Sequence, residues 1–368
     1  MSASTKITHL TSAHPRYDTR IFVKECISLV KVKEYEVSLV VADGQGDEVN
    51  NKVHIIDVGK SLSRQDRIFN TTKKIFKKAI ELDSALYHFH DPELIVVGLK
   101  LKELGKKVIF DAHEDLPKQV MSKHYLNTFS KHIISFLISK FEIYLLKKLD
   151  YIISATPIIR DKFIVNGISS QDINNFPKLD EFIDIQPSFK NNTICYIGLL
   201  YDTRGIKEIV KAIENLDVKL IIAGKFYDKS FENEITALKG WKKVDFRGFA
   251  DREEVKLILQ ESIAGLVTLH PTPSYVEAYP VKMFEYMSAG LATIASDFPI
   301  YKEFIDGNKC GVCVDPINIL VIEKSIENLL QNKEEAREMG ENGKIAIEEK
   351  YNWSIEEKKL FEIYSELV

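Results

Sequence analysis

Short apolar runs rich in β-branched residues alternate along the chain with longer segments in which apolar residues recur at helical spacing. In the first half these runs are KITHLTS, VSLVVAD, VHIIDVG, ALYHFHD, KVIFDAH and YIISATP, and in the second half they are NTICYIG, VKLIIAG, VDFRG, AGLVTLH, LATIASD and CGVCVDP. Strands that alternate with helices indicate βαβ units on parallel sheets. The pattern therefore predicts an α/β chain with two Rossmann-like, doubly wound domains.

The length of the chain supports the same division, because 368 residues exceed one ordinary hydrophobic core. The polar, proline-containing stretch DINNFPKLDEFIDIQPSFKNN is the natural linker. We expect an N-terminal domain at residues 1–176 and a C-terminal domain at residues 177–352. Residues 353–368 carry apolar side chains at helical spacing, so we expect an amphipathic helix that packs back toward the N-terminal domain.

Charge and composition narrow the functional classes. The chain has 50 basic and 54 acidic side chains, a net charge of -4, which gives no global attraction to nucleic acid. The first residues, MSASTKITHLTSAHP, lack the basic and apolar regions of a secretory signal, and no segment reaches the length that spans a bilayer. We expect a cytoplasmic protein that does not bind nucleic acid.

The four cysteines, Cys26, Cys195, Cys310 and Cys313, are too few and too scattered for a disulfide framework. The CGVC pair has the spacing of a metal or redox site, but it lacks a second pair and lies in an apolar, strand-like run. We expect buried thiols.

The stretch EAYPVKMFE, Glu277 to Glu285, carries the most informative chemistry. Proline is favoured in a first helical turn, so a helix is expected to begin near Pro280, and Gly290 stands where a left-handed cap would end it. Glu285 inside this helix can accept hydrogen bonds from both hydroxyls of a ribose. The free N–H groups at the helix start favour a diphosphate, and Glu277 in the preceding loop can bind a hydroxyl of the group that the diphosphate carries.

Other polar residues follow predicted strands, and in parallel sheets ligands bind beyond the carboxyl ends of the strands. Two interpretations stay open for most of them. His90 is either a site residue or packing at a strand end, and His113 with Glu114 is either an acceptor-side acid/base group or part of a helix N-cap. Asp18 is a helix cap or a site residue. Arg16 and Arg20 are either solvated or hold an anionic acceptor.

The two glutamates with seven residues between them, followed by a small-residue helix end and a strand, resemble the donor-site signature of retaining GT-B glycosyltransferases, and EAYPVKMFEYMSAGLATIASD is similar to family 4 of that group. The resemblance covers nearly the whole chain. TSAHPRYDTRIFVKE, YHFHDPEL, VIFDAHEDLPKQV and YIGLLYDTRGIKEIVKAI stand where that family has its N-terminal acceptor loop, cleft histidine, second acceptor loop and diphosphate loop. It implies a GT-B fold with two Rossmann-like domains that face a central cleft.

The resemblance also implies roles for individual residues. Glu285 binds the donor ribose, Glu277 a hydroxyl of the transferred sugar, and Arg204 the diphosphate, with His90 beside the sugar. The catalytic group is therefore expected to be His90, Arg204 and Glu277. The remaining donor-binding residues are expected to be Gly198, Arg247, Gly248, Ala278, Tyr279, Pro280, Val281 and Lys282. The acceptor-side residues are expected to be His14, Arg16, His113 and Glu114.

The sequence departs from the family at two points. Many members carry an arginine directly after the glycine that corresponds to Gly198, whereas Leu199 stands here, so one diphosphate cation is missing. The lysines that can replace it are Lys207, Lys225 and Lys282. Lys282 also shares a helix face with Glu285, so a structural ion pair between them is the alternative. The N-terminal loop also lacks the glycine pair that many members use beneath the donor phosphate.

The activity that the resemblance implies is retaining transfer of a hexose or N-acetylhexosamine from a nucleoside diphosphate sugar, with UDP favoured. The acceptor attacks from the face that the diphosphate leaves, and the leaving phosphate oxygen takes the proton, so neither a dedicated base nor a metal or other cofactor is expected. Cations at the diphosphate lower the barrier because negative charge builds there. The motifs resemble bacterial members that build surface polysaccharide such as O-antigen, which implies a lipid-diphosphate-linked glycan acceptor at the inner face of the cell membrane.

A basic stretch supports contact with a membrane. Lys118 to Leu149 holds six lysines and one glutamate, a net of +5, with apolar residues at helical spacing. This pattern predicts a basic amphipathic helix, which suits peripheral membrane contact. A core-packing helix with a solvated lysine face gives the same pattern.

Three other functions were weighed. A nicotinamide-dependent oxidoreductase fits the alternation of strands and helices but requires GxGxxG, and the nearest string, GQGDEVN, lacks the last glycine. A sugar-nucleotide epimerase on the same scaffold would convert the donor without an acceptor. A catalytically silent binding protein disagrees with the intact glutamate pair and Arg204.

Overall fold

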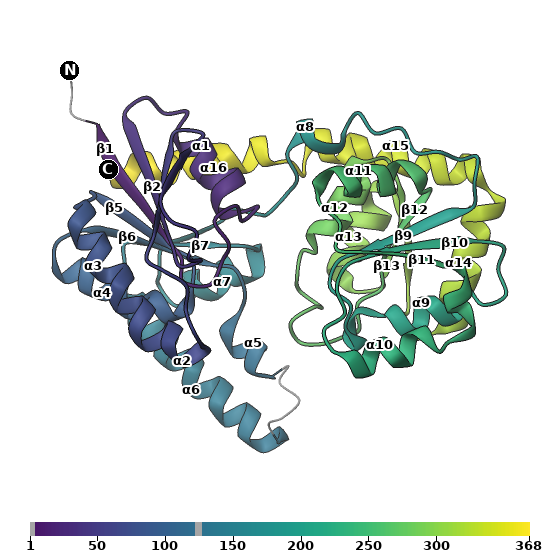
Figure 1. Ribbon diagram of the computed structural model, residues 1–368, viewed down its shortest axis with the longest axis horizontal. Helices are drawn as coiled ribbons and strands as arrows, with labels where there is room; N and C mark the ends of the chain where they lie inside the picture. Colours follow the sequence, from purple (N-terminus) through teal and green to yellow (C-terminus); the bar gives the residue numbers. More distant parts are fainter. Residues whose placement is uncertain (1–3, 122–126) are drawn as a thin grey trace. The chain divides into compact units, whose positions relative to one another are not determined.

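The structure is a computed structural model that describes residues 4–121 and 127–368, and it divides the chain into two compact units. The first unit takes the chain to Asn175 and again from Ile355 to Val368, and the second is Phe176–Ser354 (Figure 1). Each unit is a parallel sheet with helices on both faces, so the predicted α/β class with two doubly wound domains is confirmed. Among the described residues, no helix combines the length and the apolar character needed to cross a bilayer.

The sheet of the first unit has eight strands in the order β3-β4-β2-β1-β5-β6-β7-β8, and all neighbours are parallel except β3 and β4. The strands are β1 (Thr5–Leu10), β2 (Tyr35–Val41), β3 (Glu48–Asn50), β4 (Val53–Asp57), β5 (Leu86–Phe89), β6 (Lys107–Ala112), β7 (Tyr151–Ser154) and β8 (Ser170–Asp172). The order reverses between β1 and β5, because the chain first adds strands on one side of β1 and then on the other.

Apolar residues on one face of this sheet, such as Leu10, Phe89 and Phe110, pack against helices α3, α4 and α7. The helices of this unit are η1 (Ile21–Cys26), α1 (Ile27–Leu29), α2 (Arg64–Asp66), η2 (Arg67–Thr71), α3 (Thr72–Leu82), η3 (Pro92–Leu94), α4 (Ile95–Glu103), α5 (Leu116–Met121), α6 (Thr128–Leu146), α7 (Pro157–Ile164) and most of α16 (Trp353–Leu367). The opposite sheet face is different: because side chains alternate along a strand, the neighbours of Leu10 and Phe89, His9 and His88, point the other way.

The prediction of one continuous helix over Lys118 to Leu149 is wrong. The chain forms two helices, α5 and α6, and residues 122–126 between them lie outside the described part. The hydroxyl of Ser135 on α6 donates to the carbonyl of Pro117 on α5 at 3.0 Å. In one continuous helix these residues would stand about 27 Å apart at 1.5 Å per residue, so the two helices instead lie side by side.

The C-terminal helix belongs to the first unit over residues 355–368. The Tyr364 hydroxyl lies 2.8 Å from His88 Nδ1 and 3.1 Å from His9 Nε2. At the start of this segment, the Glu356 carboxylate accepts a hydrogen bond from the Asn174 N–H at 2.8 Å. The last residues of the chain are therefore bonded to its first strand.

The second unit has a six-stranded, fully parallel sheet in the order β11-β10-β9-β12-β13-β14. This is the Rossmann order, which reverses between β9 and β12. The strands are β9 (Thr193–Ile197), β10 (Lys219–Ala223), β11 (Val244–Gly248), β12 (Ala264–Val267), β13 (Ala292–Ser296) and β14 (Gly311–Val314). The helices are α8 (Leu179–Phe182), η4 (Asp202–Arg204), α9 (Ile206–Ala212), α10 (Lys229–Thr236), η5 (Lys239–Lys243), α11 (Arg252–Glu261), α12 (Val281–Ser288), α13 (Pro299–Asn308), α14 (Ile319–Gln331) and α15 (Lys333–Glu349).

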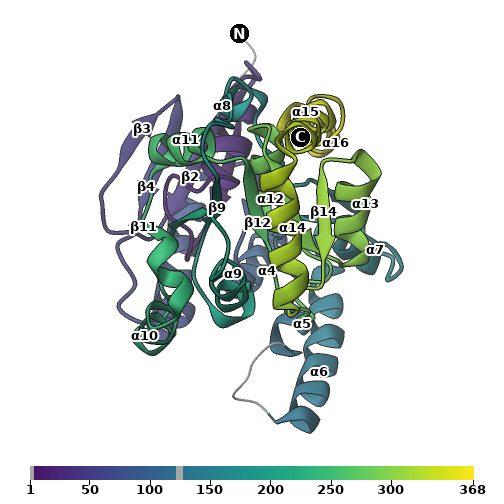
Figure 2. The ribbon, with the colours of Figure 1, turned by 90° about the vertical axis from the view of Figure 1, so that its right-hand side faces the viewer.

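Alternation along the strands builds a core on each face of this sheet. Ile194 and Tyr196 of β9 pack with α9 and α14, whereas Cys195 between them packs with α11, α12 and α13. Figures 1 and 2 show these strands and helices from two directions. Of the four thiols, those of Cys26, Cys195 and Cys310 are buried and that of Cys313 is half-buried. Cys313 lies in β14, and Cys310 directly precedes that strand. Among the described residues, neither thiol belongs to a group of side chains that is close enough to hold a metal ion.

We expect Gly265→Ala to destabilise the second unit. A Cβ on Gly265 of β12 would lie 2.2 Å from the ring of Tyr286 on α12, whose hydroxyl accepts from the Ile197 N–H at 2.9 Å. Such overpacking costs about 1–3 kcal/mol of unfolding free energy. Both tryptophans, Trp241 and Trp353, lie in this unit, so urea unfolding followed by tryptophan fluorescence reports on it.

Gly307→Ala is the matched control for this substitution, because no atom lies within 4 Å of a Cβ added there. In the helical position of Gly307, alanine should leave the unfolding midpoint unchanged or raise it. Equal midpoints for the two variants would contradict the tight contact between β12 and α12.

Candidate functional site

In the second unit, the strand order reverses where the loops after β9 and β12 meet, and this is where an open α/β sheet binds its ligand. Gly205 has φ of 72°, and a Cβ on it would lie 2.1 Å from the carbonyl oxygen of Thr268. Only glycine fits this position. The close approach fixes η4, and with it Arg204, against the carboxyl end of β12.

Arg204 is half-buried among aromatic rings. Its guanidinium carbon lies 5.3 Å from the ring centre of Tyr275 and 5.9 Å from that of Tyr201. The Nε group is buried without a hydrogen-bond partner among the described residues. A cation placed this way retains hydrogen-bonding capacity for an anion.

Lys282 is the second cation of this group. It is 8% exposed, its Nζ lies 3.6 Å from the ring centre of Tyr196, and no hydrogen-bond partner in the described part of the chain reaches that nitrogen. A Cβ on Gly198 would stand 3.1 Å from the same atom, so the ammonium lies directly beneath the turn that follows β9. Burial, and next the charge of Arg204, hold the pKa of Lys282 well below its usual range.

The helix α12 begins at Val281 with Pro280 at its N-cap, and Gly290 has φ of 77°, so the predicted start and the left-handed end are confirmed. Glu285 is half-buried on this helix, and its Oε1 accepts a hydrogen bond from Arg252 at 2.9 Å. The ion pair between Lys282 and Glu285 does not form, because Arg252 is the partner of Glu285, and Lys282 Nζ has no hydrogen-bond partner in the described part of the chain. Glu277 and residues 278–280 form the loop that leads into α12, each half-buried.

Arg247 stands apart from this group. Its guanidinium lies 3.0 Å from Asp245 and 3.1 Å from Glu261, on the edge strand β11. Gly248, the last residue of β11, has φ of 64°, and its carbonyl accepts from the Gly224 N–H at 2.6 Å. The structure therefore brings together Gly198, Arg204, Lys282 and Glu285, and not the side chain of Arg247.

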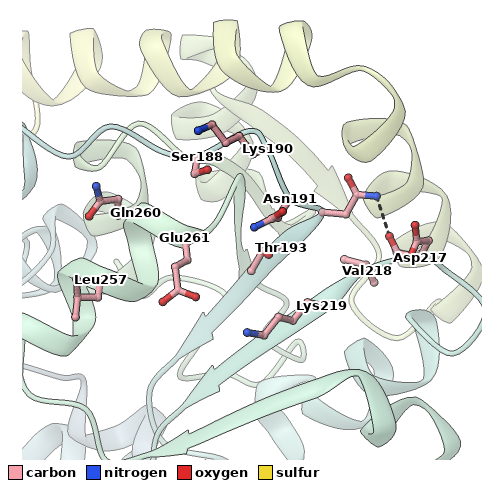
Figure 3. A pocket seen from close by; sticks show the side chains of 11 residues that line it. Ser188, Lys190, Asn191, Thr193, Asp217, Val218, Lys219, Leu257, Gln260 and Glu261 are labelled. Atoms are coloured by element: carbon pink, nitrogen blue, oxygen red, sulfur yellow. Dashed lines mark hydrogen bonds between the residues drawn. The ribbon is translucent and has the colours of Figure 1, made fainter.

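A hollow of about 760 Å³ lies at the opposite end of the same sheet (Figure 3). Thr193 and Lys219 in its wall are the first residues of β9 and β10, so it opens at the amino ends of the strands. Its other lining residues are Ser188, Lys190, Asn191, Asn192, Asp217, Val218, Leu257, Gln260 and Glu261. Ligands of doubly wound sheets bind at the other edge, so we assign the candidate site to the group around Lys282 and not to this hollow.

In the first unit, a histidine group lies at the reversal between β1 and β5. The His90 side chain is fully buried, with Nδ1 at 3.2 Å from Asp111 Oδ2, and burial lowers the pKa of His90 to about 4. His113 is 21% exposed, and its Nε2 lies 2.9 Å from the same oxygen. His14 is beside His113, with ring centres 5.0 Å apart. Burial opposes protonation of His14, but Asp18 at 3.3 Å and the charge of Asp91 raise its pKa.

The arginines of the N-terminal loop are not solvated, so that interpretation was wrong. Arg16 is 5% exposed and donates to Asp43 at 2.7 Å and to Glu48 at 3.0 Å. Arg20 is 4% exposed and binds Asp111 through two hydrogen bonds of 2.7 and 2.8 Å. Both guanidiniums are therefore held by carboxylates of this unit.

The structure resolves one of the open alternatives in this loop. The Asp18 carboxylate accepts from the N–H groups of Arg20 and Ile21 at 2.8 and 3.0 Å, which confirms the cap interpretation. Glu114 is exposed, and its carboxylate accepts from Gln119.

The sequence interpretation missed three buried members of the histidine group, His9, Glu25 and His88. The signal was present in IFVKECISLV, because Glu25 interrupts an apolar helical run on its buried face. Likewise, a strand that reads HFHD places two imidazoles on one face, since side chains two apart share a face.

Comparisons with known proteins show which protein family the second unit matches. Residues 180–346 match the family model described as glycosyl transferases group 1. The C-terminal unit carries a glycosyl transferases group 1 domain. This match includes every donor-side residue considered above, from Gly198 to Glu285.

Relatives extend the similarity to the rest of the chain. The uncharacterized glycosyltransferase MJ1069 of Methanocaldococcus jannaschii is 25% identical over an alignment of 298 positions, which covers 76% of this chain and 73% of that protein. The sucrose-phosphate synthase of Thermosynechococcus elongatus superposes with a TM-score of 0.78 at 17% identity and covers 99% of each chain. HepE of Anabaena, solved in complex with UDP-glucose, superposes with a TM-score of 0.75 at 14% identity and covers 98% of this chain and 99% of its own. The chain thus has the GT-B fold, as the resemblance implied, and its second unit contains the glycosyl transferases group 1 domain.

Proposed function

We propose that the protein is a retaining hexosyltransferase of family 4 that uses a nucleoside diphosphate sugar, with UDP favoured, and a glycan acceptor. The observation that carries this proposal is the buried side chain of Lys282 beside Arg204, on the helix that also presents Glu285, because its Nζ has no hydrogen-bond partner among the described residues. Burial lowers the pKa of Lys282, so a bound anion would be needed to stabilise its charged form. A buried charge without a partner is unfavourable by several kcal/mol. A diphosphate bound between these two cations would remove that cost.

Lys282 is accordingly our candidate for the second diphosphate cation, in place of the arginine that the family carries at the position of Leu199. The other two lysines are less suited. Lys207 is paired with Glu234, and Lys225 is exposed. Lys282 Nζ lies 3.1 Å from the position that a Cβ of Gly198 would take, so a phosphate bound at this glycine turn would be close to the lysine.

The position proposed for the diphosphate determines which residues would contact the ribose and the sugar of the donor. Glu285 would bind the ribose hydroxyls, with Arg252 holding one carboxylate oxygen in place. The backbone of Ala278 to Val281 would lie near the phosphate or sugar at the start of α12, where free N–H groups favour negative charge. Glu277 would bind a hydroxyl of the transferred sugar. The UDP-glucose complex of the Anabaena neighbour supports UDP as the nucleotide.

During transfer, negative charge builds on the leaving diphosphate, and Arg204 and Lys282 would stabilise it there. The acceptor proton passes to the leaving phosphate oxygen on the same face, which requires no base. Because the His90 side chain is fully buried, we propose that it does not touch the sugar but positions His113 through the Asp111 oxygen that both imidazoles share. His14, His113 and Glu114 would then form the acceptor-side surface.

The acceptor is proposed to be a lipid-diphosphate-linked glycan. Five large apolar side chains stand exposed along α6, with 45–62% of their surface accessible: Ile133, Phe136, Leu137, Phe141 and Tyr144. Lys140 and Lys148 extend over the rings of Phe136 and Tyr144. An apolar stripe flanked by lysines suits insertion among anionic headgroups. The sucrose-phosphate synthase has a similar fold, so the proposal of a lipid acceptor rests on the surface of α6 and not on the fold.

The donor assignment is tested by calorimetric titration of UDP, GDP and ADP into the native protein and Glu285→Ala. We expect one nucleotide to bind at micromolar strength and the variant to lose about 1–3 kcal/mol, as for hydrogen bonds to a charged group. Glu334→Ala, whose carboxylate is 84% exposed, is the control and should bind normally. If no nucleotide binds, or Glu285→Ala binds as well as the native protein, the proposed function fails.

Lys282→Met separates the diphosphate from the nucleoside. Loss of a charged hydrogen bond to phosphate should weaken UDP binding about tenfold or more, whereas uridine, which lacks phosphates, should bind unchanged. Lys282→Arg should retain part of the UDP affinity. Lys242→Met, on an exposed lysine of the same unit, is the control. An unchanged UDP affinity in Lys282→Met would show that the second cation lies elsewhere.

Membrane contact is tested by sedimentation with vesicles. The native protein should bind vesicles that contain anionic lipid more strongly than neutral ones, and added salt should weaken the binding because it screens charge. Phe136→Ser combined with Phe141→Ser should reduce binding severalfold. Phe69→Ser, on a ring that is 64% exposed elsewhere in the same unit, should not. Turnover of a soluble acceptor without lipid, together with no vesicle binding, would contradict the lipid-linked acceptor.

A further inference from the structure

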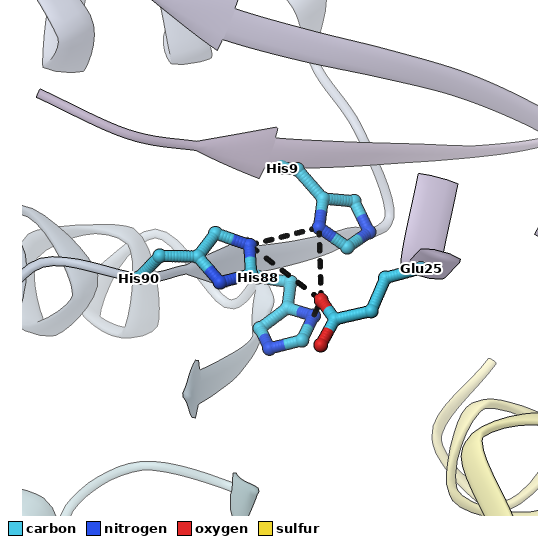
Figure 4. A group of neighbouring side chains, drawn as sticks. All are labelled: His9, Glu25, His88 and His90. Atoms are coloured by element: carbon cyan, nitrogen blue, oxygen red, sulfur yellow. Dashed lines mark hydrogen bonds and ion pairs between the residues drawn. The ribbon is translucent and has the colours of Figure 1, made fainter. Parts of the chain in front are cut away.

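Three histidines and one glutamate converge in the core of the first unit, where the strand order reverses (Figure 4). His9 on β1 is in register with His88 on β5, and His90 stands two positions further on, so all three imidazoles lie on one sheet face. Glu25 of η1 covers that face. Their residues are 0–2% exposed, so the group is shielded from water.

A buried carboxylate normally accepts hydrogen bonds, and the carboxylate of Glu25 accepts none from the described residues. Neither of its oxygens accepts a hydrogen bond from the described residues, and the only close cation is Arg20, with Nε at 3.2 Å from Oε1. Oε2 instead faces three imidazole nitrogens, each 3.9 Å away: His9 Nδ1, His88 Nδ1 and His90 Nε2. Burial without hydrogen-bond donors is strongly unfavourable for a carboxylate. Neutral imidazoles that point at it offer lone pairs, which a cation would bind together with the carboxylate.

We propose that His9, Glu25, His88 and His90 bind one divalent transition-metal ion, with zinc as the best match. Three imidazoles and one carboxylate are a ligand set that zinc takes in tetrahedral geometry at about 2.0–2.2 Å, which places neighbouring ligand atoms about 3.3–3.6 Å apart. The distances here bracket this value, with 3.0 Å between His9 Nδ1 and His90 Nε2 and 3.9 Å from each histidine to Glu25. All four ligand atoms lie within 4.8 Å of one another, so side-chain rotations would bring them to the distances of a zinc site.

The groups around these ligands also suit a metal. Metal-bound imidazoles usually donate their other N–H to a carboxylate, carbonyl or hydroxyl. His90 Nδ1 lies 3.2 Å from Asp111, and His9 Nε2 lies 3.1 Å from the Tyr364 hydroxyl. The Arg20 guanidinium is placed to hold the second oxygen of Glu25. His88 Nδ1 now bonds to Tyr364, so the ion would take over that nitrogen and leave the hydroxyl with His9.

A neighbouring group, His90, Asp111 and His113, also has metal-ligand spacing. It is the weaker candidate, because Asp111 already accepts two hydrogen bonds from Arg20, at 2.7 and 2.8 Å. His113 is partly exposed and adjoins His90, so it marks a route by which an ion reaches the buried group.

The proposed ion has a structural role and takes no part in sugar transfer. It joins β1, β5 and η1, and through Tyr364 it connects them with the C-terminal segment of the unit. The inference does not rest on the proposed function, because donor binding concerns the other unit.

The test uses the full-length protein without a histidine tag, purified without chelator. Elemental analysis by mass spectrometry should find one zinc or related ion per chain after dialysis. Protein unfolded with chelator and refolded with Co²⁺ should show the visible absorption of a tetrahedral site. Refolding with Zn²⁺ should raise the thermal midpoint above that of the metal-free protein.

Glu25→Gln and His88→Gln should lose the metal and the cobalt spectrum, whereas His54→Gln, on an exposed histidine of the same unit, should keep both. Circular dichroism checks that the variants fold, and the metal content of the native protein stands as a readout even if they do not. Native protein that contains no more metal than Glu25→Gln, and that shows neither cobalt absorption nor a thermal shift, would overturn the proposal and leave a dry hydrogen-bonded cluster.

Discussion

Both units depend on one constraint of parallel sheets, the reversal of strand order about the first strand. Crossover connections are right-handed, so strands added on the two sides of the first strand carry their helices on opposite faces. The loops at the reversal therefore separate and leave the strand ends open. In the second unit this opening lies between β9 and β12, and in the first between β1 and β5. The group around Lys282 lies at the first of these points, and the histidine group lies at the second.

The two openings hold buried ionisable groups of opposite charge type, a basic side chain in one and an acidic side chain in the other. Among the described residues, the buried side chains without a hydrogen-bond partner include a lysine in the second unit, Lys282, and a glutamate in the first, Glu25. Folding tolerates such groups only when other contacts hold them in place, as the Tyr196 ring does for Lys282 and as Arg20 does for Glu25. Burial disfavours the charged form of Lys282, and a diphosphate that binds beside it would favour that form.

Local sequence signals predicted the elements that depend on local chemistry. Runs of β-branched residues gave the strands, and Pro280 and Gly290 gave the two ends of α12. Interaction partners that are distant in the sequence could not be predicted from local patterns. Glu285 was considered with Lys282 three positions away, but its partner is Arg252 on another helix. Helical periodicity continued through Lys118 to Leu149, yet the side-by-side packing of α5 and α6 depends on tertiary contact.

Burial was the other property that the sequence hid. Arg16 and Arg20 looked like solvated charges, because nothing nearby in the sequence reveals that Asp43 and Asp111 meet them in the core. The same holds for Glu25, which stands between a lysine and a cysteine in an apolar run.

The discontinuous course of the first unit has a consequence for how the protein is made. Residues 355–368 complete this unit, and Tyr364 bonds to His9 and His88, which the ribosome produced hundreds of residues earlier. Domains generally fold in order as a chain emerges during synthesis. Here the second unit, whose residues are contiguous, has all of its chain available before the first unit does. The unit whose first residues are translated earliest is thus completed only after the second unit has been made, because residues 355–368 follow that unit in the chain.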